Sequence, residues 1–127
     1  MPENRPYVDA EEMIGYVWDH YRRLMTAFER RVGMAWLAEQ EARIGKPEVG
    51  QAMLRSAGLV GNAEADAALA GGIDAFRDKV RDRLLKEHAA EVFVNRCPRC
   101  NRIVRTPKAR QCLWCGHDWH NSRDSML

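Results

Sequence analysis

The chain has 127 residues, 46% of them hydrophobic and 30% charged, which excludes a disordered chain and leaves room for one ordinary domain or a small helical unit with a metal-stabilised appendage. It contains no run of about 18 apolar residues, and its N-terminus lacks the charged and apolar regions of a secretory signal, so we expect a cytoplasmic protein without a membrane span. The net charge is +2, but the charges are distributed unevenly. Residues 1–94 carry 13 Lys and Arg against 16 Asp and Glu, whereas residues 95–127 carry 7 Lys and Arg against 2 Asp and Glu. A basic C-terminal part of this kind indicates an anionic partner.

Residues 10–44 are predicted to form one long helix. Asp9 can cap its first turn, and Glu12 three residues later completes a capping-box pattern. Apolar residues follow in steps of three and four, which places one broad apolar stripe along a single face. Gly45 followed by Pro47 is a typical helix end. Two glycines inside the pattern are points at which the helix could bend, Gly15 and Gly33.

Two further helical segments follow along the chain. The first is expected near residues 47–56. Asn62 can cap the next, whose helical spacing is clearest over residues 73–90, after an interruption at Gly71-Gly72. We find no internal repeat. Residues 1–91 are therefore predicted to form a long helical hairpin module.

The apolar stripe of the first helix is wider than one partner helix can cover. Such a stripe favours a four-helix arrangement made by self-association, such as a homodimer, or docking onto another protein. The alternative is that the short middle helix and the C-terminal segment cover it. The residues predicted to form this protein interface are Ile14, Trp18, Tyr21, Met25, Phe28 and Trp36.

The C-terminal segment contains two cysteine pairs with the spacing C-x2-C-x11-C-x2-C, formed by Cys97, Cys100, Cys112 and Cys115. Two cysteines three residues apart across a tight turn direct both sulfur atoms into one space, and two such turns complete a tetrahedral four-thiolate metal site. Gly116 suits the positive φ that such a turn often needs. Residues 92–94 and 103–104 are the expected strands of a hairpin around the first pair.

Residues 92–120 resemble a zinc ribbon, in which β-hairpins carry two zinc knuckles. The resemblance implies one structural Zn²⁺ per chain in a small β zinc ribbon. Together with the predicted helices this gives a mainly α fold with a small β zinc ribbon, in which residues 92–127 form a second domain made of the ribbon and a short polar tail. Three alternatives are a rubredoxin-like iron site, disulfide pairing of the cysteines, and replacement of one cysteine ligand by His117 or His120. A site closed by four thiolates has no open position for activating water. No catalytic arrangement is recognised elsewhere in the sequence, and we expect no enzyme.

Basic residues surround the cysteines and suggest a contact with RNA or DNA, because cations neutralise phosphates and exposed aromatic rings stack on bases. The alternative is that the arginines balance the negative charge of four thiolates, and that the tryptophans form the small core of the ribbon. Many zinc ribbons belong to transcription or translation machinery. The candidate nucleic-acid-binding residues are Arg99, Arg102, Arg105, Lys108, Arg110 and Trp114.

Overall fold

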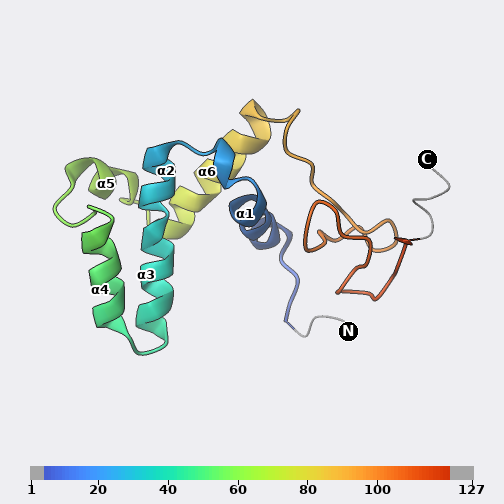
Figure 1. Ribbon diagram of the computed structural model, residues 1–127, viewed down its shortest axis with the longest axis horizontal. Coiled ribbons are helices and arrows are strands. Elements are labelled where there is room, and N and C mark those ends of the chain that lie inside the picture. Colours follow the sequence, from blue (N-terminus) through green and yellow to red (C-terminus); the bar gives the residue numbers. More distant parts are fainter. Residues whose placement is uncertain (1–4, 121–127) are drawn as a thin grey trace. The chain divides into compact units, whose positions relative to one another are not determined.

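The computed structural model describes residues 5–120, so the predicted polar tail over 121–127 lies outside the described residues. The described part is mainly helical and carries the four cysteines near its C-terminal end (Figure 1). It forms two compact units, one made of the residues up to Tyr21 together with those from His88 onward, and one made of Arg22–Glu87. We call these the cysteine unit and the helical unit. No helix in the described part is long and apolar enough to cross a membrane.

The long helix predicted over residues 10–44 is divided into several pieces. These are α1 (Asp9–His20), a single 3-10 turn (Arg22–Leu24), α2 (Ala27–Val32) and α3 (Met34–Arg43). Gly33, one of the two predicted weak points, separates α2 from α3, whereas α1 continues through Gly15. The division matters because α1 belongs to the cysteine unit and the later pieces belong to the helical unit.

A capping box causes the break before α2. Thr26 has an extended backbone, with φ −70° and ψ 161°. Its hydroxyl accepts the Glu29 backbone N–H at 3.0 Å, while the Glu29 carboxylate accepts the Thr26 N–H at 2.9 Å. The capping box that the sequence suggested at Asp9 and Glu12 does not form, since α1 begins without a side-chain cap.

The later helices follow the sequence more closely. α4 (Pro47–Ser56) has the predicted bounds, and Gly45, with φ +87°, makes the turn before it. Asn62 caps α5 (Ala63–Ala68) by accepting the Ala65 N–H at 3.0 Å. α6 (Ile73–Glu87) ends before the predicted residue 90.

The helical unit is built on the neighbouring helices α3 and α4, which a short loop connects (Figure 1). They approach closely at Gly50, where an added Cβ would lie 2.6 Å from the carbonyl oxygen of Ala38. α3 also contacts α6, where the Arg77 guanidinium lies over the Trp36 ring at 4.2 Å from its centroid. A glycine and a cation–π contact thus fix the position of α3 in this unit.

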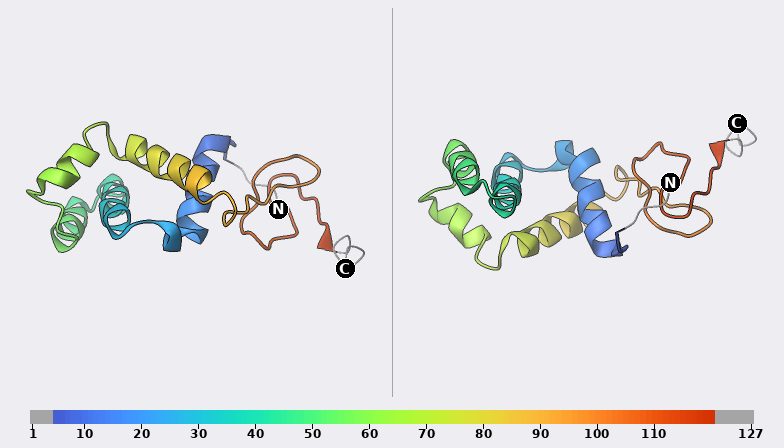
Figure 2. Two further views of the ribbon diagram at one scale, coloured as in Figure 1. Left: turned by 90° about the horizontal axis from the view of Figure 1, so that it is seen from above. Right: turned by 90° about the horizontal axis from the view of Figure 1, so that it is seen from below.

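The cysteine unit combines α1 with residues 92–120, which we call the cysteine segment. The small β ribbon predicted there is not shown: the described residues of this segment contain two isolated antiparallel bridges, Arg96–Ile103 and Gln111–Asp118, within turns and irregular backbone (Figure 2). The expected domains were residues 1–91 and 92–127, whereas α1 groups with the cysteine segment. The small core of the segment consists of Cys97, Val104, Cys112 and Trp114, with Tyr7, Cys100, Ala109 and Trp119 packed against it.

Candidate metal centre

Each cysteine pair lies in a turn whose amides point at a sulfur atom. Cys97 Sγ accepts the backbone N–H groups of Arg99 and Cys100 at 3.3 and 3.5 Å. In the second turn, Cys112 Sγ accepts those of Trp114 and Cys115 at the same two distances. Amide donors of this kind stabilise the thiolate form of a cysteine, which is the form that binds metal.

The two turns repeat one backbone pattern at an interval of fifteen residues. The Cys97 N–H bonds to the Arg102 carbonyl at 2.9 Å, and the Cys112 N–H bonds to the His117 carbonyl at 2.8 Å. The residue after each pair has a left-handed backbone, with φ 64° at Asn101 and φ 82° at Gly116. This repeat is not visible in the amino-acid sequence, because only the cysteine pairs recur there, whereas Asn and Gly are different residues that both tolerate this conformation.

The four sulfur atoms lie in a group of the size that one tetrahedral metal ion requires. All four are within 4.8 Å of one another. Cys97 and Cys115 have their sulfurs 3.7 Å apart, and Cys100 and Cys112 have theirs 3.6 Å apart. Metal–sulfur bonds of about 2.3 Å in a tetrahedron place sulfurs about 3.8 Å apart, whereas a disulfide requires about 2.05 Å. The cysteines are free thiols positioned to hold one metal ion.

Burial differs strongly among the four ligands. Cys97 and Cys112 are 1% and 0% exposed, whereas Cys115 is exposed. Burial raises the pKa of the Cys100 thiol to about 12. A backbone hydrogen bond from His117 lowers the pKa of Cys115 to about 7. The site therefore has one exposed thiol that ionises readily and a buried side that requires a cation to hold its thiolates.

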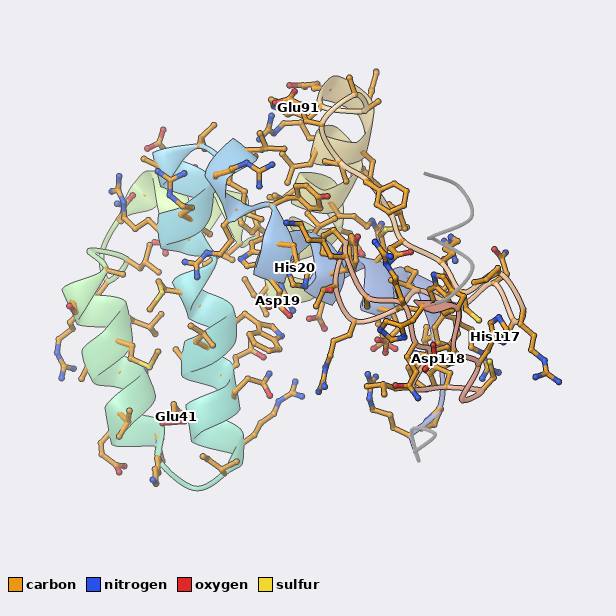
Figure 3. The ribbon with its side chains drawn as sticks, turned by 45° about the vertical axis from the view of Figure 1, so that its right-hand side comes forward. Asp19, His20, Glu41, Glu91, His117 and Asp118 are labelled. Carbon is orange, nitrogen blue, oxygen red and sulfur yellow. The ribbon has the colours of Figure 1, made fainter. Side chains whose placement is uncertain are left out.

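The two candidate histidine ligands have other neighbours. The His117 ring stacks on Trp119, with centroids 5.7 Å apart. His120 Nδ1 bonds to the Asp118 carboxylate at 2.6 Å. Figure 3 labels His117 and Asp118 in the cysteine segment. The metal-ligand group found among the described residues contains the four cysteines and neither histidine.

The predicted nucleic-acid-binding residues separate into two groups. Trp114 is 9% exposed and belongs to the core of the segment, where Arg102 lies 5.7 Å from its ring centroid. Arg102 also lies 5.2 Å from the Tyr7 ring. The other four are Arg99, Arg105 and Lys108, which are exposed, and Arg110, which is half-buried.

The predicted interface residues are at least half-buried within the chain. Ile14, Tyr21 and Met25 are buried, and Trp18, Phe28 and Trp36 are half-buried. The stripe was expected on one continuous helix, but it is distributed over α1, the 3-10 turn, α2 and α3.

Sequence reasoning missed the side chains that attach the N-terminal residues to the cysteine segment. The hydroxyl of Tyr16 donates to the Phe93 carbonyl at 2.5 Å and accepts the Asn95 N–H at 3.2 Å. His20, labelled on α1 in Figure 3, bonds through Nε2 to the Arg105 carbonyl at 2.9 Å. These partners are more than 75 residues apart in the chain, and no local sequence pattern predicts such a pair. The only available signal was that the three tyrosines of the chain all lie in residues 7–21.

No protein-family model matches this chain, and comparisons with curated proteins and with solved structures find no similar protein.

Proposed function

We propose that this chain is a non-enzymatic, zinc-binding interaction module, in which Cys97, Cys100, Cys112 and Cys115 hold one structural Zn²⁺ in a zinc-ribbon-like segment. The observation that carries the proposal is the sulfur cluster, whose separations fit a tetrahedral ion. Zinc fits four thiolates in a closed tetrahedron, and such a site leaves no coordination position for a substrate or for water. The bound ion would stabilise the fold of a segment whose own apolar core is small.

Metal analysis tests this assignment. The full chain, purified without added metal and then loaded with zinc, should contain one zinc per chain and little iron by mass spectrometry. Cys97→Ser and Cys112→Ser should abolish tight binding, because each removes a buried ligand. His120→Ala is the matched control and should keep one zinc. Iron in place of zinc, or zinc loss in the histidine variant, would overturn the four-cysteine zinc site.

The helical unit is proposed to bind a second copy of this chain. Support comes from an apolar groove of about 500 Å³ in the helical unit, beside α3 and α4. None of the six residues predicted for this role lines it. Val49, Ala52, Met53 and Ser56 recur along α4 at helical spacing. We propose that the same face of a second α4 packs against them around a two-fold axis. The groove is lined by Arg31, Met34, Val49, Ala52, Met53, Ser56 and Ala57.

The oligomeric state tests that surface. Light scattering should give a dimer mass at micromolar concentration, and Val49→Glu with Met53→Glu should shift it to a monomer, because two charges would then enter the apolar contact. Gln51→Glu places a charge on another face of α4 and serves as the control. A wild-type monomer at all concentrations tested would exclude self-association through this groove.

The second candidate is a nucleic-acid-binding role for the cysteine segment. One observation favours it: among residues 5–120, the side chains of Arg99, Arg105, Lys108 and Arg110 take part in no ion pair. Three of the four lie on the turn over residues 105–110, which the Asn95 side chain holds by donating to the carbonyls of Thr106 and Ala109 at 2.9 Å. A positioned basic turn suits contacts to phosphates rather than to bases, because Trp114 is buried.

Salt-dependent binding separates this candidate from a purely structural role for the charges. Labelled single-stranded and duplex RNA and DNA should bind the zinc-loaded chain, and Arg105→Ala with Lys108→Ala should lower the slope of log affinity against log salt by about 1 per lost phosphate contact. Lys46→Ala with Arg55→Ala removes two exposed charges from the helical unit and should leave the slope unchanged. No binding at low salt would exclude the role.

A further inference from the structure

The chain segment that enters the first cysteine turn is paired with tyrosine side chains instead of a β-strand. The Tyr21 hydroxyl accepts the Phe93 N–H at 3.0 Å and donates to the Phe93 carbonyl at 3.3 Å. Tyr16 bonds the same carbonyl and the Asn95 N–H. The hydroxyls of Tyr16, within α1, and of Tyr21, which follows α1, thus supply the partners that a neighbouring strand would supply to an extended backbone.

The contacts continue on both sides of the first cysteine pair. Before it, the Asp9 carboxylate accepts two hydrogen bonds from Arg96, at 2.8 and 3.1 Å. After it, the Tyr7 hydroxyl accepts the Ile103 N–H at 3.0 Å, and His20 bonds the Arg105 carbonyl. The N-terminal residues therefore bond to the chain on both sides of the first cysteine turn.

The N-terminal residues also complete the core beside the sulfur atoms. The Tyr7 ring meets Trp114 edge-on, with centroids 4.9 Å apart. The guanidinium of Arg5 lies 4.8 Å from the centroid of the Trp114 ring. Trp114 lies two residues after Cys112, and its backbone N–H donates a hydrogen bond to Cys112 Sγ. The core that surrounds the cysteines is consequently assembled from two parts of the chain that are about ninety positions apart.

We propose that zinc binding and the docking of residues 5–21 onto the cysteine segment are a single coupled event, so that α1 is a zinc-controlled element. This inference rests on the proposed zinc site. Without the ion, the two turns lose the centre that holds them together, and the backbone groups of residues 93–105 lose the arrangement that Tyr7, Tyr16 and Tyr21 bind. α1 has twelve residues, a length at which an isolated helix is marginal in water. Released from the segment, it should unfold.

Zinc binding and the docking of α1 must influence each other equally, because the two equilibria are thermodynamically linked. If zinc stabilises the docked α1, then docking must raise the affinity for zinc by the same factor. Removing one hydroxyl of the contact should therefore weaken zinc binding, although that hydroxyl is not a ligand.

Hydrogen exchange of the full chain tests the first half of the inference. The amides of α1 should be protected in the zinc-loaded chain and should exchange at least about tenfold faster after chelation. The amides of α4 in the helical unit should keep their rates and serve as an internal control. Zinc content is measured in the same samples. One zinc per chain with equal α1 protection before and after its removal would overturn the coupling alone, whereas a chain that takes up no zinc would overturn both proposals.

Zinc competition with a chromophoric chelator tests the second half. Tyr16→Phe keeps the ring but removes both hydrogen bonds, and should raise the zinc dissociation constant about tenfold. Glu29→Gln, in the helical unit, should leave it unchanged. If Tyr16→Phe does not fold, Tyr21→Phe removes the neighbouring hydroxyl and should act in the same direction. An unchanged zinc affinity in a folded tyrosine variant would overturn the inference.

Discussion

Glu29 and Arg83 join α2 to α6 through two hydrogen bonds, from Arg83 Nη2 at 2.6 Å and from Nε at 2.8 Å. The same carboxylate accepts the Thr26 N–H in the capping box. Glu29 thus both completes the capping box of α2 and attaches this helix to α6. Burial alone would raise its pKa, but the hydrogen bonds from Arg83 and from the Thr26 backbone outweigh burial, and the pKa lies below the ordinary value for Glu.

The pH dependence of stability follows from that lowered pKa. A group with a lower pKa in the folded chain stabilises it above the unfolded pKa, about 4.3 for Glu, and loses the contribution as the pH falls through the folded value. Glu29→Gln keeps the capping box, since Gln also serves there, but removes the ion pair. We expect it to lower the free energy of unfolding by about 1 kcal/mol at pH 7. The difference from wild type should shrink below about pH 4.3.

Urea unfolding followed by far-UV circular dichroism at pH 7, 5, 4 and 3 measures this difference. Glu48→Gln is the control, because Glu48 is exposed on α4. A Glu29→Gln deficit that stays constant down to pH 3 would show that the ion pair is not its cause.

Replacement of a helical glycine by alanine should have opposite effects on stability at Gly50 and at Gly15. In Gly50→Ala the new Cβ would lie 2.6 Å from the Ala38 carbonyl oxygen, so α3 and α4 must move apart. That strain costs about 1–3 kcal/mol and should exceed the roughly 1 kcal/mol that Ala gains as a helix former. In Gly15→Ala the Cβ meets no atom within 4 Å, so only the gain of about 0.5–1 kcal/mol remains.

Thermal and urea unfolding of the zinc-loaded variants check this pair. Gly50→Ala should lower both the melting temperature and the urea midpoint, and Gly15→Ala should raise them. A stabilised Gly50→Ala would mean that the two helices separate without loss of packing.

The structural features predicted correctly from the sequence are those that depend on one local sequence pattern with no conflicting pattern nearby. C-x2-C spacing placed four sulfurs within 4.8 Å, and Pro47 with Gly45 located the start of α4. The prediction of one long helix failed because two local signals compete there. Apolar spacing runs unbroken from Tyr21 to Phe28, while Thr26 caps a new helix that begins at Ala27. The capping box expected at Asp9 and Glu12 is not formed, whereas one that was not predicted forms at Thr26 and Glu29.

The remaining features of the cysteine segment could not be predicted from the sequence, because they depend on contacts between residues that are far apart in the chain. The expected strand over residues 92–94 is β-branched and aromatic, yet Phe93 bonds to Tyr16 and Tyr21 and pairs with no strand. Strand propensity reports how a residue fits a pleated surface, but not what supplies its hydrogen-bond partners. A hydroxyl more than 70 positions away satisfies the same backbone groups.

The left-handed residues that follow the two cysteine pairs test how strictly the turns are required for zinc binding. Gly116→Ala places no new atom within 4 Å of a neighbour, so its cost comes from the φ of 82° alone, about 1–2 kcal/mol. Because folding of so small a segment and metal binding are one equilibrium, zinc affinity should fall about tenfold. Asn101, with φ 64° at the equivalent position, already tolerates this conformation. Asn101→Ala should therefore weaken zinc binding as Gly116→Ala does, whereas Asn101→Gly should not. Chelator competition on all three variants measures the effect, and equal zinc affinity in Gly116→Ala and wild type would show that the second turn forms without its left-handed residue.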